Sequence, residues 1–456
     1  MTPQISAGDT AWVLGASALV LFMTPGLAFF YGGLVRNKNV LGTIMQSFIV
    51  MGLVGVLWVI IGYSLAFGPD VHGWGLIGNL DYVGLRHVGA NPLPGSTVPS
   101  EAFMIFQAMF AIITPALITG AFAERAKFGP FLIFMAAWSL LVYAPVAHWV
   151  FASSGWIAHD VKGVDFAGGT AIHVNAGVAA LAAAFMFGRR KGHKQEPMEP
   201  HDITMVVLGA SILWFGWFGF NAGSAGAASP VAVNAFTVTN TAAAAAALSW
   251  TAMSWWQSGK PSVVGAAAGA VAGLVAITPA SGYVQPMEAI AIGAIAGIVC
   301  YLAVQLRSRT ALDDSLDVVA VHGVGGLTGA LLTGVFCVAA ATTGVNALGH
   351  GVNGLTHGGG VDQLWRQAVG IAAVAPYSFI MTLGILKVLD MVFGLRVSEE
   401  EEIAGLDVSQ HGERAYIFGG SGPVLGIPEA IPVHMHGATP ATAAEHQLQP
   451  APGPAQ

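Results

Sequence analysis

Eleven apolar stretches recur along this chain, and each has the roughly 17 to 25 residues needed to cross the hydrocarbon of a membrane. Hydrophobic residues make up 55% of the 456 residues and charged residues only 9%, which is more apolar surface than a soluble core can hide. The sequence therefore predicts an all-α polytopic membrane protein, embedded in a lipid membrane. Its eleven transmembrane helices are centred near Val20, Val54, Ala111, Ala137, Val178, Leu213, Ala246, Ala270, Ala296, Thr328 and Ile380.

The positive charges are distributed unevenly between the loops. Of the 17 Lys and Arg residues, only Arg86, Lys162 and Arg366 lie in or beside loops that follow even-numbered stretches. Because cytoplasmic loops carry the excess of cations, we expect the N-terminus outside, the C-terminus in the cytoplasm and the protein in the cell (inner) membrane. The segment before the first stretch has no Lys or Arg, so we expect no cleaved signal peptide. No basic arm indicates nucleic-acid binding, and we expect no cofactor.

Two histidines, His173 and His322, lie inside apolar, glycine-rich stretches. An ionisable side chain at membrane depth is costly, so it is a candidate for lining a polar path, although a single histidine can also be a packing residue. Two histidines in matched settings favour the first interpretation, because the simplest partner of each is the other or a solute. Neither has a Cys, Asp or Glu three or four residues later, so a metal site is not indicated.

The settings of the two histidines also indicate an internal repeat. Each has a glycine four residues later, Gly177 or Gly326, and an aspartate eight residues earlier, Asp165 or Asp314. If the repeat unit is five spans, the halves are inverted in the membrane, which commonly places the working site at their interface. The predicted domain of residues 1–397 then consists of halves at about 10–190 and 203–340 and a last helix at about 364–393.

Other polar and aromatic residues allow two interpretations each. Asp165 at the start of the fifth span is either a helix cap or a carboxylate that adds negative potential near a cation entrance, and both can hold. The aromatic groups around Phe110, Trp149 and Phe220 fit either interfacial belts or a cage for a small cation, with Ser224 as an acceptor. Residue 222 is alanine, so the nucleophile elbow of hydrolases is absent, and we do not expect an enzyme.

Six segments together resemble the ammonium transporter family, Amt/Mep/Rh, and its bacterial Amt branch in particular. They cover roughly residues 10 to 416 from the first span to the tail. They read FFYGGLVRNKNVL, FQAMFAIITPALITGAFAER, DFAGGTAIHVNAG, WFGWFGFNAGSA, DDSLDVVAVHGVGG and GLDVSQHGERAY.

The resemblance implies a fold, an assembly and a set of site residues. It implies eleven spans with two inverted five-helix repeats plus a final helix, a homotrimer, and one pore for ammonium or ammonia in each subunit. Ammonium would be recruited outside, deprotonated, and passed on as ammonia, with net charge movement. The implied roles are His173 and His322 as paired pore histidines, Phe110 and Phe220 as the gate, Ser224 and Asp165 at the outer site, and Trp217 as a pore-lining aromatic.

One position departs from the family pattern. Phe151 stands where the outer site of the Amt branch usually has tryptophan. Tryptophan is the best cation–π partner, so the resemblance predicts weaker cation recruitment unless Trp149 moves in. Conduction through the pore should not depend on this position.

The tail predicts a second function, which is regulatory. Residues 398–416 resemble the cytoplasmic tail that couples subunits and responds to PII signal proteins, with the motif residues Gly405, Asp407, His411, Gly412, Glu413 and Tyr416. Residues 417–456 are rich in Pro, Ala and Gly, which predicts a disordered extension. An Rh-like neutral gas channel and an ammonium sensor remain alternative functions.

Overall fold

The computed structural model describes residues 4–339 and 352–416, and this part of the chain is helical without a β-strand. Ten helices are long and apolar enough to cross a membrane, and α10 (Val263–Ile277) is a shorter apolar helix. The predicted eleven spans are therefore present. The first five are α1 (Ala7–Leu34); α2 (Val40–Leu57) continued by α3 (Tyr63–Phe67); α4 (Ser100–Ile118); α5 (Phe128–Trp138) continued by α6 (Ala144–Phe151); and η7 (Gly169–Val174) continued by α7 (Asn175–Phe187).

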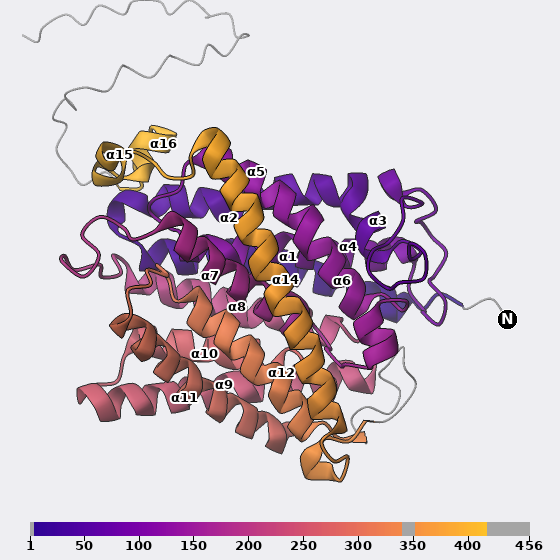
Figure 1. Ribbon diagram of the computed structural model, residues 1–456. Helices are drawn as coiled ribbons and strands as arrows, with labels where there is room; N and C mark the ends of the chain where they lie inside the picture. Colours follow the sequence, from indigo (N-terminus) through magenta and orange to yellow (C-terminus); the bar gives the residue numbers. More distant parts are fainter. Residues whose placement is uncertain (1–3, 340–351, 417–456) are drawn as a thin grey trace, which may run out of the picture. The chain divides into compact units, whose positions relative to one another are not determined.

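The second half repeats this order and is followed by one more span. Figure 1 shows that last helix, α14, crossing the bundle obliquely, and it contacts α7 and α12. The remaining elements are α8 (Ile203–Gly223), α9 (Pro230–Ser258), α10, α11 (Pro286–Arg309), η8 (Val319–Val324) continued by α12 (Gly325–Phe336), α14 (Asp362–Phe393), α15 (Glu399–Ala404) and α16 (Leu406–His411).

The short tail helices α15 and α16 pack on one end of the bundle, which we call the tail side. α1 begins at the opposite end, as Figure 1 shows. Lys38, in the loop between the first two spans, donates from Nζ to the carbonyls of Glu402 (3.0 Å) and Ile403 (2.7 Å). Residues up to Ala415 accordingly form one compact unit. The predicted disorder of residues 417–456 lies outside the described residues.

Spans five and ten start late, and each opens with a π-helical turn that carries its histidine. η7 begins at Gly169 and η8 at Val319, three to four residues before His173 and His322. The chain therefore enters the protein as a loop before each helix starts. A loop at membrane depth is tolerated where its backbone groups find partners inside the protein. These late starts bring both histidines toward the middle of the bundle.

Glycines allow these two spans to touch beside the histidines. A Cβ on Gly177 would lie 2.2 Å from the Cα of Gly323, and a Cβ on Gly326 would lie 2.8 Å from the Cβ of His173. Only hydrogen fits at these positions, so the two backbones pack in direct contact. Small residues at helix crossings are the usual means of close approach in membranes, where lipid supplies no hydrophobic drive.

We expect Gly177→Val to lower the thermal unfolding temperature of the detergent-purified protein, because its side chain must displace the Gly323 backbone. Overpacking of this kind costs about 1–3 kcal/mol. The matched control is Gly384→Ala in α14, where an added Cβ meets nothing within 4 Å. Equal unfolding temperatures of Gly177→Val and wild type would contradict the crossing described here.

Candidate functional site

The rings of His173 and His322 are in contact in the centre of the bundle. Their Nδ1 atoms lie 3.3 Å apart, and both residues are buried, at 1% and 4% exposure. The predicted contact is therefore present. A hydrogen bond between the two Nδ1 atoms needs a proton on one and a lone pair on the other. Two imidazolium rings would each carry a proton on Nδ1, and the two N–H groups would repel each other. The geometry thus favours at least one neutral ring.

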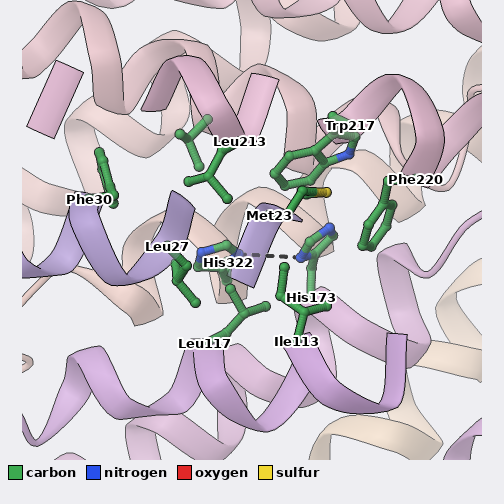
Figure 2. Close-up of a pocket in the computed structure, with 11 residues that line it drawn as sticks. Met23, Leu27, Phe30, Ile113, Leu117, His173, Leu213, Trp217, Phe220 and His322 are labelled. Atoms are coloured by element: carbon green, nitrogen blue, oxygen red, sulfur yellow. Dashed lines mark hydrogen bonds between the residues drawn. The ribbon is translucent and has the colours of Figure 1, made fainter. Parts of the chain in front are cut away.

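The histidine pair forms part of the wall of a narrow cavity of about 10 Å³. That volume is about what one water-sized solute needs. Figure 2 shows the two rings pointing toward each other among apolar side chains from α1, α4 and α8. Apart from the histidines and the Trp217 indole, the wall is aliphatic or phenyl. It consists of Met23, Leu27, Phe30, Ile113, Leu117, His173, Leu213, Trp217, Phe220, Val271 and His322.

A run of aromatic rings leads away from the pair at one end of this cavity. The Phe220 ring lies 6.0 Å from that of His173, with an interplanar angle of 18°. Phe110 lies 4.5 Å from Phe220, and Phe106 lies 4.9 Å from Phe110, measured between ring centroids. The two phenylalanines expected to form a gate are therefore in direct contact, next to the histidines.

Trp217 forms one wall of the cavity and is held by a partner that the sequence did not suggest. Its ring lies 5.5 Å from that of His173, and its Nε1–H donates to Thr278 Oγ1 over 2.8 Å. Thr278 follows the short helix α10, in a segment with no distinguishing motif. A buried indole N–H needs such an acceptor, so the hydroxyl fixes the ring beside the pore histidine.

The other end of the cavity adjoins a larger and more polar one. Phe30 and His322 line both the small cavity and a second cavity of about 320 Å³. The wall of the second cavity includes the hydroxyls of Tyr31, Ser254, Ser258 and Ser262 and the carboxylate of Asp317. Ser262 is the N-cap of α10, and Asp317 lies two residues before the start of η8. His322 therefore lies between an apolar constriction and a polar cavity.

Neither Ser224 nor Asp165 lines the small cavity. Ser224 caps the end of α8, one turn after Phe220, and its Oγ donates to the Phe220 carbonyl over 2.8 Å. Asp165 accepts four backbone N–H groups, from Gly168, Gly169, Thr170 and Ala171 (2.6–3.1 Å). The capping interpretation of Asp165 is therefore correct, whatever else the carboxylate does.

Phe151 and Trp149 lie at the end of α6, in a different environment from the small cavity. Both belong to a cluster with Ile157 and Val374, in which Phe151 is partly buried. The Trp149 Nε1–H donates to the Leu76 carbonyl over 2.8 Å, and its ring lies 4.7 Å from that of Tyr377. Trp149 is thus fixed in this cluster. It could replace the missing tryptophan at position 151 only by breaking that hydrogen bond.

The tail motif contacts the start of α2, the loop before it, and the start of α5. Asp407 Oδ1 accepts the Gly42 N–H at the start of α2 (2.8 Å), and Asn39 Oδ1 accepts the Leu406 N–H (2.8 Å). Each segment thus caps the other. The His411 ring packs edge-on against Phe128 at a centroid distance of 5.1 Å.

Three further tail residues shape this motif. Gly405 and Gly412 have left-handed backbones (φ 99° and 68°), which glycine adopts without strain, and the Glu413 N–H donates to the Asp407 carbonyl. Tyr416 is the last described residue.

Comparison with known proteins agrees with this arrangement. The sequence profile of the Ammonium Transporter Family matches residues 11–416. An ammonium transporter of Mycobacterium tuberculosis is 49% identical over 443 residues, covering 92% of both chains. The crystal structure of Candida albicans Mep2 superposes with a TM-score of 0.82 at 36% identity, covering 87% of this chain and 88% of that one. A structure described as a sensor Amt protein gives 0.79 at 30% identity, covering 89% and 98%. The chain belongs to the ammonium transporter family.

Proposed function

We propose that this protein transports ammonium across a membrane. In this proposal the ion is recruited at the outer aromatic site, loses a proton at the Phe110–Phe220 gate, and crosses as ammonia along His173 and His322. The observation that carries the proposal is the contact between two buried imidazoles in a cavity sized for one small solute. Its presence in a chain of the ammonium transporter family supports the assignment.

The apolar wall of the cavity favours ammonia over ammonium. An unpaired ion moved into an apolar medium carries a desolvation cost of tens of kcal/mol by idealised estimates, and no described residue in the cavity wall supplies a carboxylate to offset it. A neutral solute with both hydrogen-bond donors and an acceptor suits neutral imidazoles, which offer one of each. The Nε2 atom of His173 is buried, and no hydrogen bond from the described residues reaches it. It is available to such a solute.

The proton left at the gate needs its own route if charge is to cross. The Nδ1–Nδ1 contact of the histidines offers a path for proton exchange between the rings, and His322 borders the polar cavity on the tail side. We propose net charge movement by this route, with ammonia and the proton moving separately. A neutral gas channel of the Rh type would carry the solute without current.

Replacing both pore histidines tests this mechanism. In proteoliposomes, His173→Ala with His322→Ala should lower the ammonium-evoked current by about tenfold or more, because a lost pair of hydrogen bonds in an apolar site is worth about 1–3 kcal/mol. His159→Ala is the matched control, since that histidine is exposed and pairs with its neighbour Asp160. Retained ammonium current with unchanged selectivity against potassium would exclude the proposed role.

Phe151 is proposed to weaken cation capture at the outer site. Phe151→Trp should lower the half-saturating ammonium concentration about two- to fivefold, the equivalent of about 0.5–1 kcal/mol of additional cation–π attraction at an exposed site. The maximal rate should change less than the half-saturating concentration. Concentration series of ammonium uptake measure both. An unchanged half-saturating concentration would show that the ring at position 151 does not contribute to recruitment.

An ammonium sensor is the second candidate, because a sensor Amt protein is among the structural relatives. The transporter of M. tuberculosis is more similar in sequence, at 49% against 30% identity, and this favours transport. Deleting the tail separates the two functions. Lost signalling with intact uptake would indicate sensing.

We propose that the tail regulates transport from the cytoplasmic side, in a homotrimer in the inner membrane with the N-terminus outside. A PII signal protein is the proposed partner. The reciprocal capping between Asp407 and the start of α2 supports a link between the tail and the first span. The cation-rich loops on the same side support the orientation.

Releasing the tail should reduce uptake if this link matters. Asp407→Ala removes the acceptor of the Gly42 N–H, so we expect faster cleavage of the tail in limited proteolysis and a lower ammonium uptake rate. Glu400→Ala is the control on the exposed face of α15. A released tail with wild-type uptake would exclude a regulatory role for these contacts.

A further inference from the structure

Asp165 and Asp314 occupy equivalent places in the two halves, yet their carboxyl groups are bonded differently. Both oxygens of Asp165 accept backbone N–H groups, two each. Asp314 Oδ2 accepts the Val319 N–H over 2.7 Å, but no hydrogen bond from the described residues reaches Oδ1. The Asp314 residue is nevertheless fully buried, at 0% exposure. A buried carboxylate oxygen without a donor is expensive, and protonation removes most of that cost.

The cations near Asp314 are bonded to other acids. The Arg190 guanidinium pairs with Asp313 over 2.9 Å, and Arg307 of α11 donates to Asp317 Oδ1 over 2.8 Å. Burial raises the pKa of Asp313, but Arg190 outweighs this effect and holds it well below its usual range. Asp313 and Asp314 are adjacent in the chain, but Asp313 is the one that is paired with the Arg190 guanidinium.

The remaining groups that face Asp314 do not compensate its charge. Asp317, in the same loop, is a second acid, and Tyr31 of α1 donates its hydroxyl to the Leu117 carbonyl (3.0 Å). Burial, together with the charge of Asp317, raises the pKa of Asp314 to about 7, against opposing contributions from the Val319 N–H and Arg307. A carboxyl with a pKa raised in this way is suited to bind a proton near neutral pH.

Asp314 is connected to the pore through η8. Its acceptor contact is with Val319, the first residue of that segment, and His322 follows one turn later. A negative charge at a helix N-terminus stabilises the first turn, and its loss removes that effect. A proton on Asp314 therefore changes the electrostatic potential at the start of the segment that carries His322. Asp165 differs in its bonding, because each of its carboxylate oxygens accepts two backbone N–H groups.

We propose that Asp314, in the loop before η8, is a proton-binding residue that carries its proton on Oδ1 and couples the pH on the tail side to passage past His322. Proton binding is independent of the transported solute. The coupling rests on the proposed transport function, in which His322 is the last residue of the constriction. Asp314 acts through η8 and is a positioning residue.

Infrared difference spectra of the purified protein test proton binding directly. The wild type should show the carbonyl stretch of a protonated carboxyl group that disappears as the pH rises through about 7, and Asp314→Asn should lack this band. Asp160→Asn, at an exposed acid paired with His159, should keep it. A band of equal size in wild type and Asp314→Asn would overturn the proposal.

Stability gives a second readout that does not depend on transport. The pKa of Asp314 is raised on folding, so the unfolded state releases this proton first, at about pH 4, and stability falls until the folded protein releases it at about pH 7. As the pH rises from about 4 to about 7, the unfolding temperature of the wild type should therefore decrease relative to that of Asp314→Asn. Asparagine resembles the protonated acid and should fold. In Asp165→Asn the amide NH2 would face two backbone N–H donors, so this variant should have a lower unfolding temperature. Parallel pH profiles of wild type and Asp314→Asn would contradict the proposal.

The coupling is tested by varying the pH on the tail side of oriented proteoliposomes. Ammonium-evoked current of the wild type should change as this pH crosses about 7, and Asp314→Asn should lose that dependence. The same dependence in both proteins would overturn the coupling. If the wild type conducts no ammonium at any pH, the proposed transport function and the coupling fail together, whereas the infrared band still decides whether Asp314 binds a proton.

Discussion

The direct contact between the fifth and tenth spans is the constraint on which the position of the histidine pair, and so of the cavity around it, depends. Gly177 and Gly326 let the two backbones touch, and the contact places a histidine from each half beside the other. An isolated imidazole at membrane depth would lack a hydrogen-bond partner, at a cost of a few kcal/mol. Here each ring supplies the partner of the other, in a cavity large enough for only one small solute.

The two ends of this constriction differ in chemistry. Toward one side the histidines adjoin stacked phenylalanine rings, and toward the tail side they adjoin a cavity with hydroxyl and carboxylate groups. The aspartates before the two histidine spans also differ. Both carboxylate oxygens of Asp165 accept hydrogen bonds, whereas no hydrogen bond from the described residues reaches Asp314 Oδ1. An inverted repeat has thus given one fold with unequal halves.

The sequence predicted the fold well, because long apolar stretches have few alternatives to membrane helices. The histidine pair could also be predicted, from two costly side chains in matched settings. Span counting alone does not give the depth of these residues, since it cannot see that Gly169 and Val319 start their spans late. Thr278 was missed because a threonine after an apolar helix carries no signal until its partner Trp217 is known. The cavity residues Met23 and Leu27 were missed for a similar reason, because they look like any other apolar position on a membrane helix.

The central claim is that ammonia and a proton leave ammonium at the gate and cross a dry pore separately. The most direct measurement is the current evoked by ammonium in proteoliposomes containing the wild-type protein, across a range of pH, with methylammonium and potassium as controls. The account predicts a current with ammonium, a smaller one with methylammonium, and none with potassium at any pH. Ammonium uptake without current, or a potassium current of similar size, would contradict it.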